Sequence, residues 1–244
     1  MRTILIFLTI ASFVSCKKAE DRTCWKSSGK TSEREVFVND FSRLEVFEHL
    51  AVRLVKDTVC KAVIKGGENL LKLIEITEKN DFLVLENKNR CRFLRYKNGQ
   101  INIELHYKTL SEIYFRGTDS LISNDIMEFN QFKITLQDGA GSINLRVNGN
   151  SMNIENPHGW GDITLKGNLN SIQLDMDGNG FFNTRQLVVS DSINVLSKSS
   201  VISFLNAQTP KLKAEVSGSA DIWCFGVPNI LLKNEYGKGK LVFK

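Results

Sequence analysis

At 244 residues the chain is long enough for one large or two ordinary domains, and its composition is that of a globular protein. Its 3 prolines argue against a proline-rich linker or a disordered stalk. Lysine and arginine (32) exceed aspartate and glutamate (27) only slightly, a surplus too small to indicate nucleic-acid binding.

Residues 1–15 are predicted to be a lipoprotein signal peptide, and Cys16 its lipidation site. Arg2 precedes an apolar run of about 15 residues, which is too short to cross a bilayer, for which about 20 are needed. Ser15 before the cysteine is similar to the lipobox of bacterial lipoproteins, although Phe13 stands where leucine is usual. The alternative is an ordinary secretory signal followed by an incidental cysteine. Lipid chains on Cys16 would anchor the protein to a membrane by burying their methylene groups.

Residues 16–34 are predicted to be a polar tether, because they carry little that can be buried. Their net positive charge could rest on anionic lipid headgroups, but a solvated spacer is the favoured interpretation.

Residues 35–110 are predicted to form an N-terminal region of strands and hairpins. Apolar and polar residues alternate through most of it, which is typical of strands with one buried face. Residues 69–78 also fit a helix, but their β-branched side chains and the surrounding strands favour a strand. Asn98-Gly99 lies between two alternating runs and predicts a hairpin turn, because both residues tolerate positive φ.

A basic stretch lies just before this predicted turn. Its positive charges are Lys88, Arg90, Arg92, Arg95 and Lys97. One interpretation is a patch that binds an anionic glycan or lipid. The favoured alternative is a solvated hairpin tip whose charges protect an edge strand from aggregation. Nucleic acid is the least favoured partner, because the chain carries an export signal.

Besides Cys16, the chain contains Cys24, Cys60, Cys91 and Cys224. Export permits disulfides, and Cys60–Cys91 is the preferred pair because both residues lie near strand ends of the predicted N-terminal sheet. Free buried thiols are equally compatible with the sequence. Cys224 lies in an apolar strand and is expected inside. No cysteine or histidine spacing indicates a metal site, and no cofactor is predicted.

A turn of small residues recurs from Gly117 to the C-terminus at a spacing of about 20 residues. The turns are Gly117-Thr118-Asp119, Gly139-Ala140-Gly141-Ser142, Gly159-Trp160-Gly161-Asp162, Gly178-Asn179-Gly180, Lys198-Ser199-Ser200, Gly218-Ser219-Ala220-Asp221 and Gly237-Lys238-Gly239. A fixed period of this length is typical of solenoids. Residues 111–244 are therefore predicted to form parallel β-helix repeats, each repeat being one rung, in one continuous all-β domain over 35–244.

Short alternating strands flank each turn, so each rung has an apolar face that only neighbouring rungs can cover. We expect Leu174 to point into this shared core. Asp162 and Asp221 are expected to cap corners by accepting hydrogen bonds from backbone N–H groups. An antiparallel sandwich or barrel is the competing architecture, but its strands need not repeat at a fixed period.

The rung Gly159-Trp160-Gly161-Asp162-Ile163-Thr164-Leu165-Lys166-Gly167, and residues 216–222 and 237–239, resemble the repeating pattern of the family called putative auto-transporter adhesin, head GIN domain. Residues 41–105 are similar to the N-terminal part of that family. Lys198-Ser199-Ser200 and Phe181-Phe182 depart from the pattern at single corners. The resemblance implies a bacterial envelope protein with a right-handed β-helix and no established activity.

Catalytic groups are sparse. Asp175 and Asp177 are predicted on the outward face of one strand, with Arg185 nearby in sequence. Neighbouring carboxylates could act as the acid and base of a glycosidase, and β-helices do host polysaccharide-cleaving enzymes. Outward positions are usually polar, however, and the 3 histidines have no partnered acid at a motif spacing.

Exposed aromatic residues are better candidates for binding. Trp160 lies between two glycines at a corner and has little room inside, while Trp223 alternates with Ile222 and Cys224 and is expected to face outward. A tryptophan ring can stack on the apolar face of a sugar. Packing against a neighbouring rung is an equally good interpretation of both residues.

The sequence therefore predicts an exported, lipid-anchored binding module of the cell envelope, on the periplasmic or the surface side of an outer membrane. Its predicted partners are the membrane, through the lipid anchor, and a polysaccharide or another envelope protein, and its predicted role is adhesin-like. No enzymatic activity and no nucleic-acid partner are predicted. The alternative is a carbohydrate-active β-helix enzyme.

Overall fold

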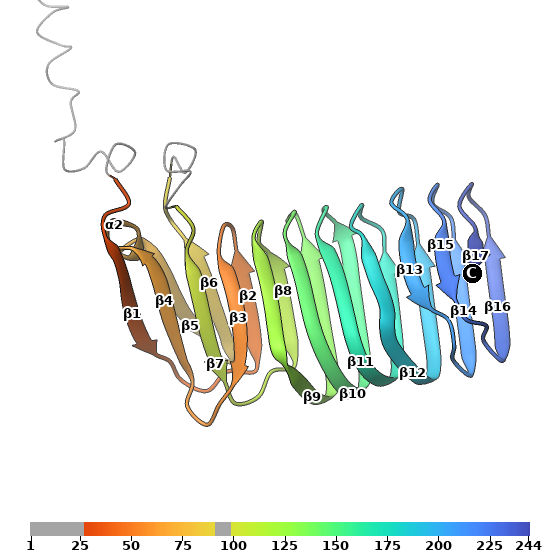
Figure 1. The fold of residues 1–244 in the computed structure, drawn as a ribbon, viewed down its shortest axis with the longest axis horizontal. Coiled ribbons are helices and arrows are strands. Elements are labelled where there is room, and N and C mark those ends of the chain that lie inside the picture. The colour runs from red at the N-terminus through yellow and green to blue at the C-terminus, as the bar shows by residue number, and fades with distance from the viewer. Residues whose placement is uncertain (1–26, 91–98) are drawn as a thin grey trace, which may run out of the picture.

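The computed structural model describes residues 27–90 and 99–244, which form a parallel β-solenoid that begins with a group of N-terminal strands (Figure 1). The N-terminal elements are β1 (Thr31–Phe37), β2 (Arg43–Phe47), β3 (Ala51–Lys56), β4 (Lys61–Gly67), α2 (Glu68–Leu71), β5 (Ile74–Lys79), β6 (Phe82–Asn87) and β7 (Asn102–Tyr107). The strands of the regular rungs are β8 (Glu112–Arg116), β9 (Ser120–Gln137), β10 (Ser142–His158), β11 (Asp162–Met176), β12 (Phe182–Ser197), β13 (Ser203–Asn206), β14 (Lys211–Val216), β15 (Ile222–Phe225), β16 (Ile230–Glu235) and β17 (Leu241–Phe243).

The strands form two facing layers, which we call layer A and layer B (Figure 1). Layer A contains β5, β6, β2, β8, the second halves of β9 to β12, β14 and β16, in that order of pairing. Layer B contains β1, β4, β7, β3, the first halves of β9 to β12, β13, β15 and β17. The long strands β9 to β12 bend from one layer into the other. All pairs from β8 onward are parallel, as the solenoid prediction requires.

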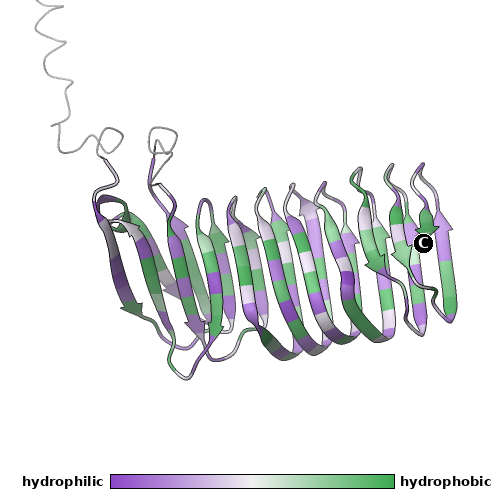
Figure 2. Cartoon of the chain, viewed as in Figure 1, coloured by the Kyte–Doolittle hydropathy of each residue, from purple (hydrophilic) through white to green (hydrophobic). Residues whose placement is uncertain are grey.

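The core lies between the layers and is built from straight columns of apolar side chains. In layer A one such column runs through Ile113, Ile134, Ile154, Leu174, Val195 and Ala214, each paired with the next and each buried. Burial of an isoleucine or leucine side chain contributes about 1.5–3 kcal/mol. The alternation of hydrophobic and hydrophilic residues along the strands is visible in Figure 2. Leu174 therefore points inward, as predicted.

The glycine turns are stacked on one another along the axis of the solenoid. The backbone N–H of Trp160 donates to the carbonyl of Gly139 at 2.9 Å, and the N–H of Asn179 donates to Gly159 at 2.8 Å. Gly159 has a φ of +133°, and a Cβ on Gly141 would lie 2.1 Å from the carbonyl oxygen of Asp119. Neighbouring corners therefore approach too closely for a side chain at such a position, and the predicted column of corners is confirmed.

The N-terminal region departs from the regular rungs and from two expectations. β1 pairs with β4, β4 with β7, and β5 with β6, all antiparallel. Residues 69–78 do not form one strand, because α2 precedes β5 and buries the consecutive residues Leu70 and Leu71 together. A single strand face could not bury both.

The hairpin predicted at Asn98-Gly99 is not formed by the strands on either side of it. β6 pairs with β2 and β5 in layer A, whereas β7 pairs with β3 and β4 in layer B. The segment between β6 and β7 therefore connects the two layers, and residues 91–98 themselves lie outside the described part. Within the described part, no helix has the length and apolar character needed to cross a membrane.

Candidate functional site

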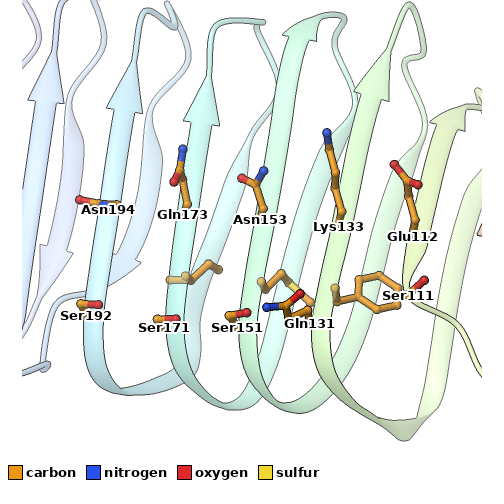
Figure 3. A pocket seen from close by; sticks show the side chains of 13 residues that line it. Ser111, Glu112, Gln131, Lys133, Ser151, Asn153, Ser171, Gln173, Ser192 and Asn194 are labelled. Atoms are coloured by element: carbon orange, nitrogen blue, oxygen red, sulfur yellow. The ribbon is translucent and has the colours of Figure 1, made fainter.

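The outward face of layer A carries polar side chains aligned from rung to rung, which we call the polar face. One column consists of Gln131, Ser151, Ser171 and Ser192, and the next of Glu112, Lys133, Asn153, Gln173 and Asn194. Figure 3 shows these columns running side by side over β8 to β12. Together with Ser111 they line an open hollow of about 540 Å³.

The polar face is organised by hydrogen bonds within and between rungs. Lys133 pairs with Glu155 across neighbouring strands at 2.9 Å, and the Asn153 amide donates to the same carboxylate at 2.9 Å. Gln173 donates to Asp175 at 3.0 Å. Hydroxyl and amide groups thus stand at the spacing between strands, about 4.8 Å, along the solenoid axis. Such a surface can exchange hydrogen bonds with a polar polymer that lies along that axis.

Trp160 projects into solvent from the corner between β10 and β11. The residue is 67% exposed, and its backbone N–H bonds to the carbonyl of Gly139 at the corner. The prediction that this tryptophan faces outward is confirmed. A ring exposed to this degree is available for stacking on a sugar.

Trp223 also faces outward, but it is packed against neighbouring rungs. Its ring stacks on Phe204 with 5.6 Å between centroids, and the Lys244 ammonium lies 4.7 Å from the ring centroid. Phe204 further contacts Phe181 and Phe225 edge-on, at 5.2 and 5.8 Å. We call Phe181, Phe204, Trp223 and Phe225 the aromatic cluster. A sugar could stack on Trp223 only by displacing Lys244.

The predicted basic patch is only partly within the described residues. Lys88 forms ion pairs with Glu86 and, at 4.0 Å, with Glu75. The hydrogen bond to Glu86 is the main reason why the pKa of Lys88 is raised. Arg90 is exposed at the end of the described segment. Arg92, Arg95 and Lys97 lie outside the described residues, as does the predicted lipidation site Cys16, so the patch and the anchor stay predictions.

The carboxylates considered for catalysis are held by neighbouring side chains. Asp175 accepts the amide of Gln173, and Asp177 pairs with Lys198 at 2.8 Å. Arg185 lies in layer B, whereas Asp175 is in layer A, so the arginine is not brought to these carboxylates.

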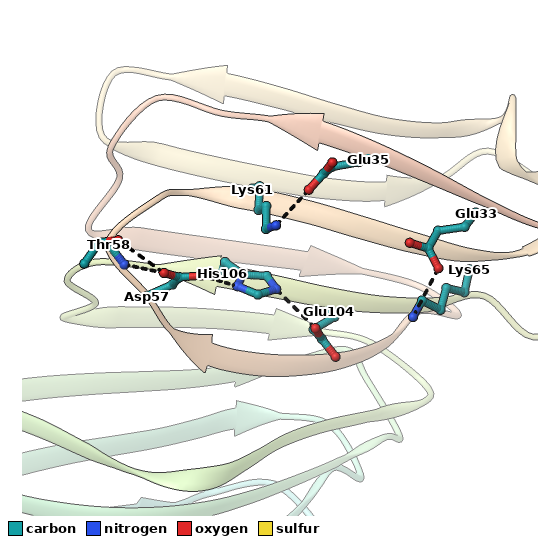
Figure 4. A network of polar contacts seen from close by, with 8 residues as sticks. All are labelled: Glu33, Glu35, Asp57, Thr58, Lys61, Lys65, Glu104 and His106. Carbon is teal, nitrogen blue, oxygen red and sulfur yellow. Dashed lines mark hydrogen bonds and ion pairs between the residues drawn. The ribbon is translucent and has the colours of Figure 1, made fainter.

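The histidines lie apart from one another, and two of them bind side chains of other strands and turns. His106 Nδ1 lies 2.8 Å from Asp57 and its Nε2 lies 3.1 Å from Glu104, in a polar network of the N-terminal strands (Figure 4). The hydrogen bond between His106 and Asp57 is the main reason why the pKa of the Asp57 carboxyl lies below its usual value. His49 bonds to Thr118 near a rung corner, and His158 is exposed at the end of β10. The ion pairs and hydrogen bonds in Figure 4 join neighbouring N-terminal strands.

Cys60 and Cys224 are buried free thiols. Cys224 is inside, as predicted. Cys91, the other half of the preferred disulfide, lies outside the described residues, as does Cys24. In residues 27–90 and 99–244, no histidine, cysteine, aspartate and glutamate side chains are grouped so that they could hold a metal ion.

A family model matches residues 40–228, and its family is described as putative auto-transporter adhesin, head GIN domain. The chain belongs to this family. The resemblance inferred from the glycine-rich rungs is thereby confirmed, and an adhesin-like family points to the cell surface or envelope. No curated protein matches the chain.

Several crystal structures share the fold of this adhesin-family protein. A putative adhesin from Bacteroides fragilis has a TM-score of 0.78 at 19% identity, over 88% of this chain and 97% of that one. A putative adhesin from Parabacteroides merdae has a TM-score of 0.63 at 16% identity, over 89% and 98%. A putative lipid binding protein from Parabacteroides distasonis has a TM-score of 0.64 at 17% identity, over 88% and 98%.

Proposed function

We propose that this protein is an exported, lipid-anchored binding module of the cell envelope, and that it works in adhesion without catalysing a reaction. Its proposed ligand is a polysaccharide or another envelope protein that lies along the solenoid. Cys16 is the proposed site of lipidation, and residues 16–34 are the tether between the membrane and the solenoid.

The polar face is the observation that carries this proposal. Its hydroxyl and amide groups repeat on successive strands and line an open hollow of about 540 Å³ (Figure 3). Small-molecule sites are mostly concave and apolar, whereas this surface is long, open and polar. Membership in an adhesin family supports the same conclusion. The exposed ring of Trp160 adds a place where a sugar can stack.

The binding proposal is tested with the purified domain and insoluble polysaccharides. We expect retention of the domain with no new reducing ends and no unsaturated products. Gln173→Ala combined with Asn194→Ala should reduce retention, and so should Trp160→Ala. Glu215→Ala, on layer A but outside the hollow, is the control and should leave retention unchanged. Product formation that is lost in Asp175→Asn would favour the alternative, a polysaccharide-cleaving enzyme.

The anchoring proposal needs a separate experiment. Cells that express the protein are labelled with a fatty acid, and Cys16→Ser should abolish the label while Cys24→Ser retains it. Protease treatment of intact cells then distinguishes the surface from the periplasmic side. Labelling of the Cys16→Ser variant would contradict lipidation at this residue.

A further inference from the structure

We infer that the outward face of layer B carries a second site, a groove for an acidic polysaccharide, in which Arg146, Lys166 and Arg185 bind the carboxylate or sulfate groups. This inference rests on the proposed function as a polymer-binding module, and it names the class of polymer. The groove lies on the layer opposite to the polar face.

Strand pairing brings two of the three cations together. Arg146 of β10 and Lys166 of β11 are direct neighbours across the parallel pair, and both side chains are exposed. Like charges in this position repel each other, so the arrangement costs stability unless an anion lies between them. The guanidinium of Arg146 donates to the backbone carbonyl of Asn124 at 3.3 Å, which restricts where it can point.

A β-bulge brings Arg185 into the same surface. Between Thr164 and Lys166 of β11 the pairing advances by two residues, whereas on β12 it advances from Asn183 to Gln186, by three. The extra residue leaves Thr184 buried and turns both Arg185 and Gln186 outward. Bulges often re-aim a side chain in this way. Gln186 is consequently the residue opposite Lys166, and Arg185, next to it in the chain, also faces outward and lines the same hollow as Lys166.

Two adjoining hollows connect these side chains. One, of about 370 Å³, is lined by Lys166, Asn183, Arg185 and Gln186 among others, and the second, of about 570 Å³, by Arg146, Asn148, Lys166 and Gln186. They share Lys166 and Gln186, so they adjoin on this layer, and we call the two hollows together the groove. The described residues that line the groove include no carboxylate.

The cations in the groove are not engaged by carboxylates, unlike several lysines elsewhere on the described surface. Lys56 pairs with Glu128 at 3.3 Å, and Lys65 pairs with Glu33 at 3.2 Å. By contrast, Arg146, Lys166 and Arg185 form no ion pair with any residue in 27–90 or 99–244. Their field is therefore available to an anionic ligand.

The aromatic cluster holds the cations at one end of the groove in place. The Arg185 guanidinium lies 4.1 Å from the ring centroid of Phe225 and 5.8 Å from that of Phe204. Lys244 lies over Trp223 at 4.7 Å and extends the positive surface by further rungs. Cation–π contacts of this kind already restrict these flexible side chains in the free protein. Less conformational entropy is therefore lost when a ligand binds.

The chemistry of the groove favours a glycan over other polyanions. Asn148, Asn183 and Gln186 supply amides for sugar hydroxyls between the charges. Among the described residues, no aromatic side chain lines the two hollows, and the rings of the aromatic cluster at their end pack against one another, Arg185 and Lys244 instead of offering open faces for stacking nucleic-acid bases. A lipid surface is disfavoured because the cations line concave polar hollows. A lipid-binding face would offer several exposed apolar side chains, whereas Ile126 is the large exposed apolar residue among those that line the groove.

The test measures binding of the full domain to polygalacturonate, to dextran sulfate and to neutral dextran at several salt concentrations. We expect both acidic polymers to bind, dextran to bind much more weakly, and affinity to fall as salt is added. The double variant Arg146→Gln, Lys166→Gln should weaken binding of the acidic polymers by about tenfold, and Arg185→Gln should weaken it further. Lys56→Gln with Lys65→Gln removes the same net charge from paired lysines and should have little effect.

If both double variants lose affinity for the acidic polymers equally, the proposed site is rejected. The loss would then follow from the net charge of the protein and not from the groove. Equal binding of dextran and polygalacturonate would overturn the acidic class while leaving the proposed binding function intact. Failure to retain any polysaccharide, neutral or acidic, would reject the proposed polysaccharide ligand together with this inference. Tighter binding to single-stranded DNA, or to vesicles containing phosphatidylglycerol, would reject the glycan as the ligand of the groove.

Discussion

The carboxylate of Asp162 accepts a hydrogen bond from the backbone N–H of Phe181, with 2.9 Å between Oδ1 and the nitrogen. Phe181 lies at the next corner along the solenoid, so this bond ties one rung to its neighbour. Asp221 does the same for the N–H of Lys240, also at 2.9 Å. The corner caps predicted for both aspartates are thus confirmed, and each one satisfies a backbone donor of the following rung.

Replacement of Asp162 by alanine should therefore destabilise the solenoid. The change removes the acceptor for the Phe181 N–H, and loss of such a side-chain cap costs about 1 kcal/mol. Chemical denaturation of both proteins would measure this cost. The control is Asp191→Ala, because the Asp191 carboxylate bonds to its sequence neighbour Ser192 and not to another rung. Equal stability of Asp162→Ala and the wild type would show that the corner does not depend on this bond.

A change of Leu174 should affect stability far more than a change of the adjacent Gln173. Leu174 is 2% exposed within the core column, so Leu174→Ala should cost about 2–5 kcal/mol, and Leu174→Asp should prevent folding because it buries an unpaired charge. Gln173 faces outward, and Gln173→Ala should change the unfolding free energy by less than about 0.5 kcal/mol. A thermal melt of Leu174→Asp that matches the wild type would contradict the assignment of inward and outward faces.

Burial raises the pKa of the Cys224 thiol from 9.0 to about 12. Because the folded-state pKa lies above the unfolded value, the neutral thiol contributes stability that is complete below about pH 9 and is lost as the pH rises toward 12. The unfolding free energy of the wild type should fall more steeply above pH 9 than that of Cys224→Ala. Iodoacetamide at about pH 8, followed by mass spectrometry of the Cys224 peptide, should show modification only after denaturation. Rapid labelling of the native protein would mean that the thiol is not buried.

Asn156 is a buried residue whose amide group is expected to lower the stability of the fold. Its side chain is fully buried at the corner beneath Gly178, and neither its amide nitrogen nor its amide oxygen has a hydrogen-bond partner among residues 27–90 and 99–244. Each buried polar group without a partner costs about 1–3 kcal/mol. Asn156→Leu, which nearly keeps the shape of the side chain, should therefore raise the unfolding free energy. Destabilisation by this change would indicate that the amide binds an internal partner such as an ordered water.

The regular rungs could be predicted because each step depends on local information. The alternation that places Leu174 inward and Trp223 outward has the period of a strand, and the spacing of the glycine turns sets the length of a rung. The N-terminal strands were harder because their partners are not set by a repeat. The turn at Asn98-Gly99 looks like a hairpin in the sequence, yet the strands on either side of it belong to different layers.

The candidate surfaces were less predictable because they depend on register between rungs. The sequence predicts the outward face of Trp223, but its contact with Phe204 depends on the pairing of β13 with β15. Arg185 is near Asp175 in sequence, whereas in the structure it lies in the other layer and lines the same hollow as Lys166. Lys88, expected in a basic patch, is paired with Glu86. A shift of the strand register by one residue moves a side chain from one face of the sheet to the other. The spacing of the turns does not define the register to within one residue.

Binding of a polymer along several rungs is the central claim, and a length series of oligogalacturonides tests it most directly. Successive rungs are about 4.8 Å apart, so a longer oligosaccharide should contact more of them. Titration calorimetry should show affinity that increases with the number of sugars and then reaches a plateau once the groove over β10 to β12 is filled. Affinity that does not change with length from the disaccharide onward would contradict the account.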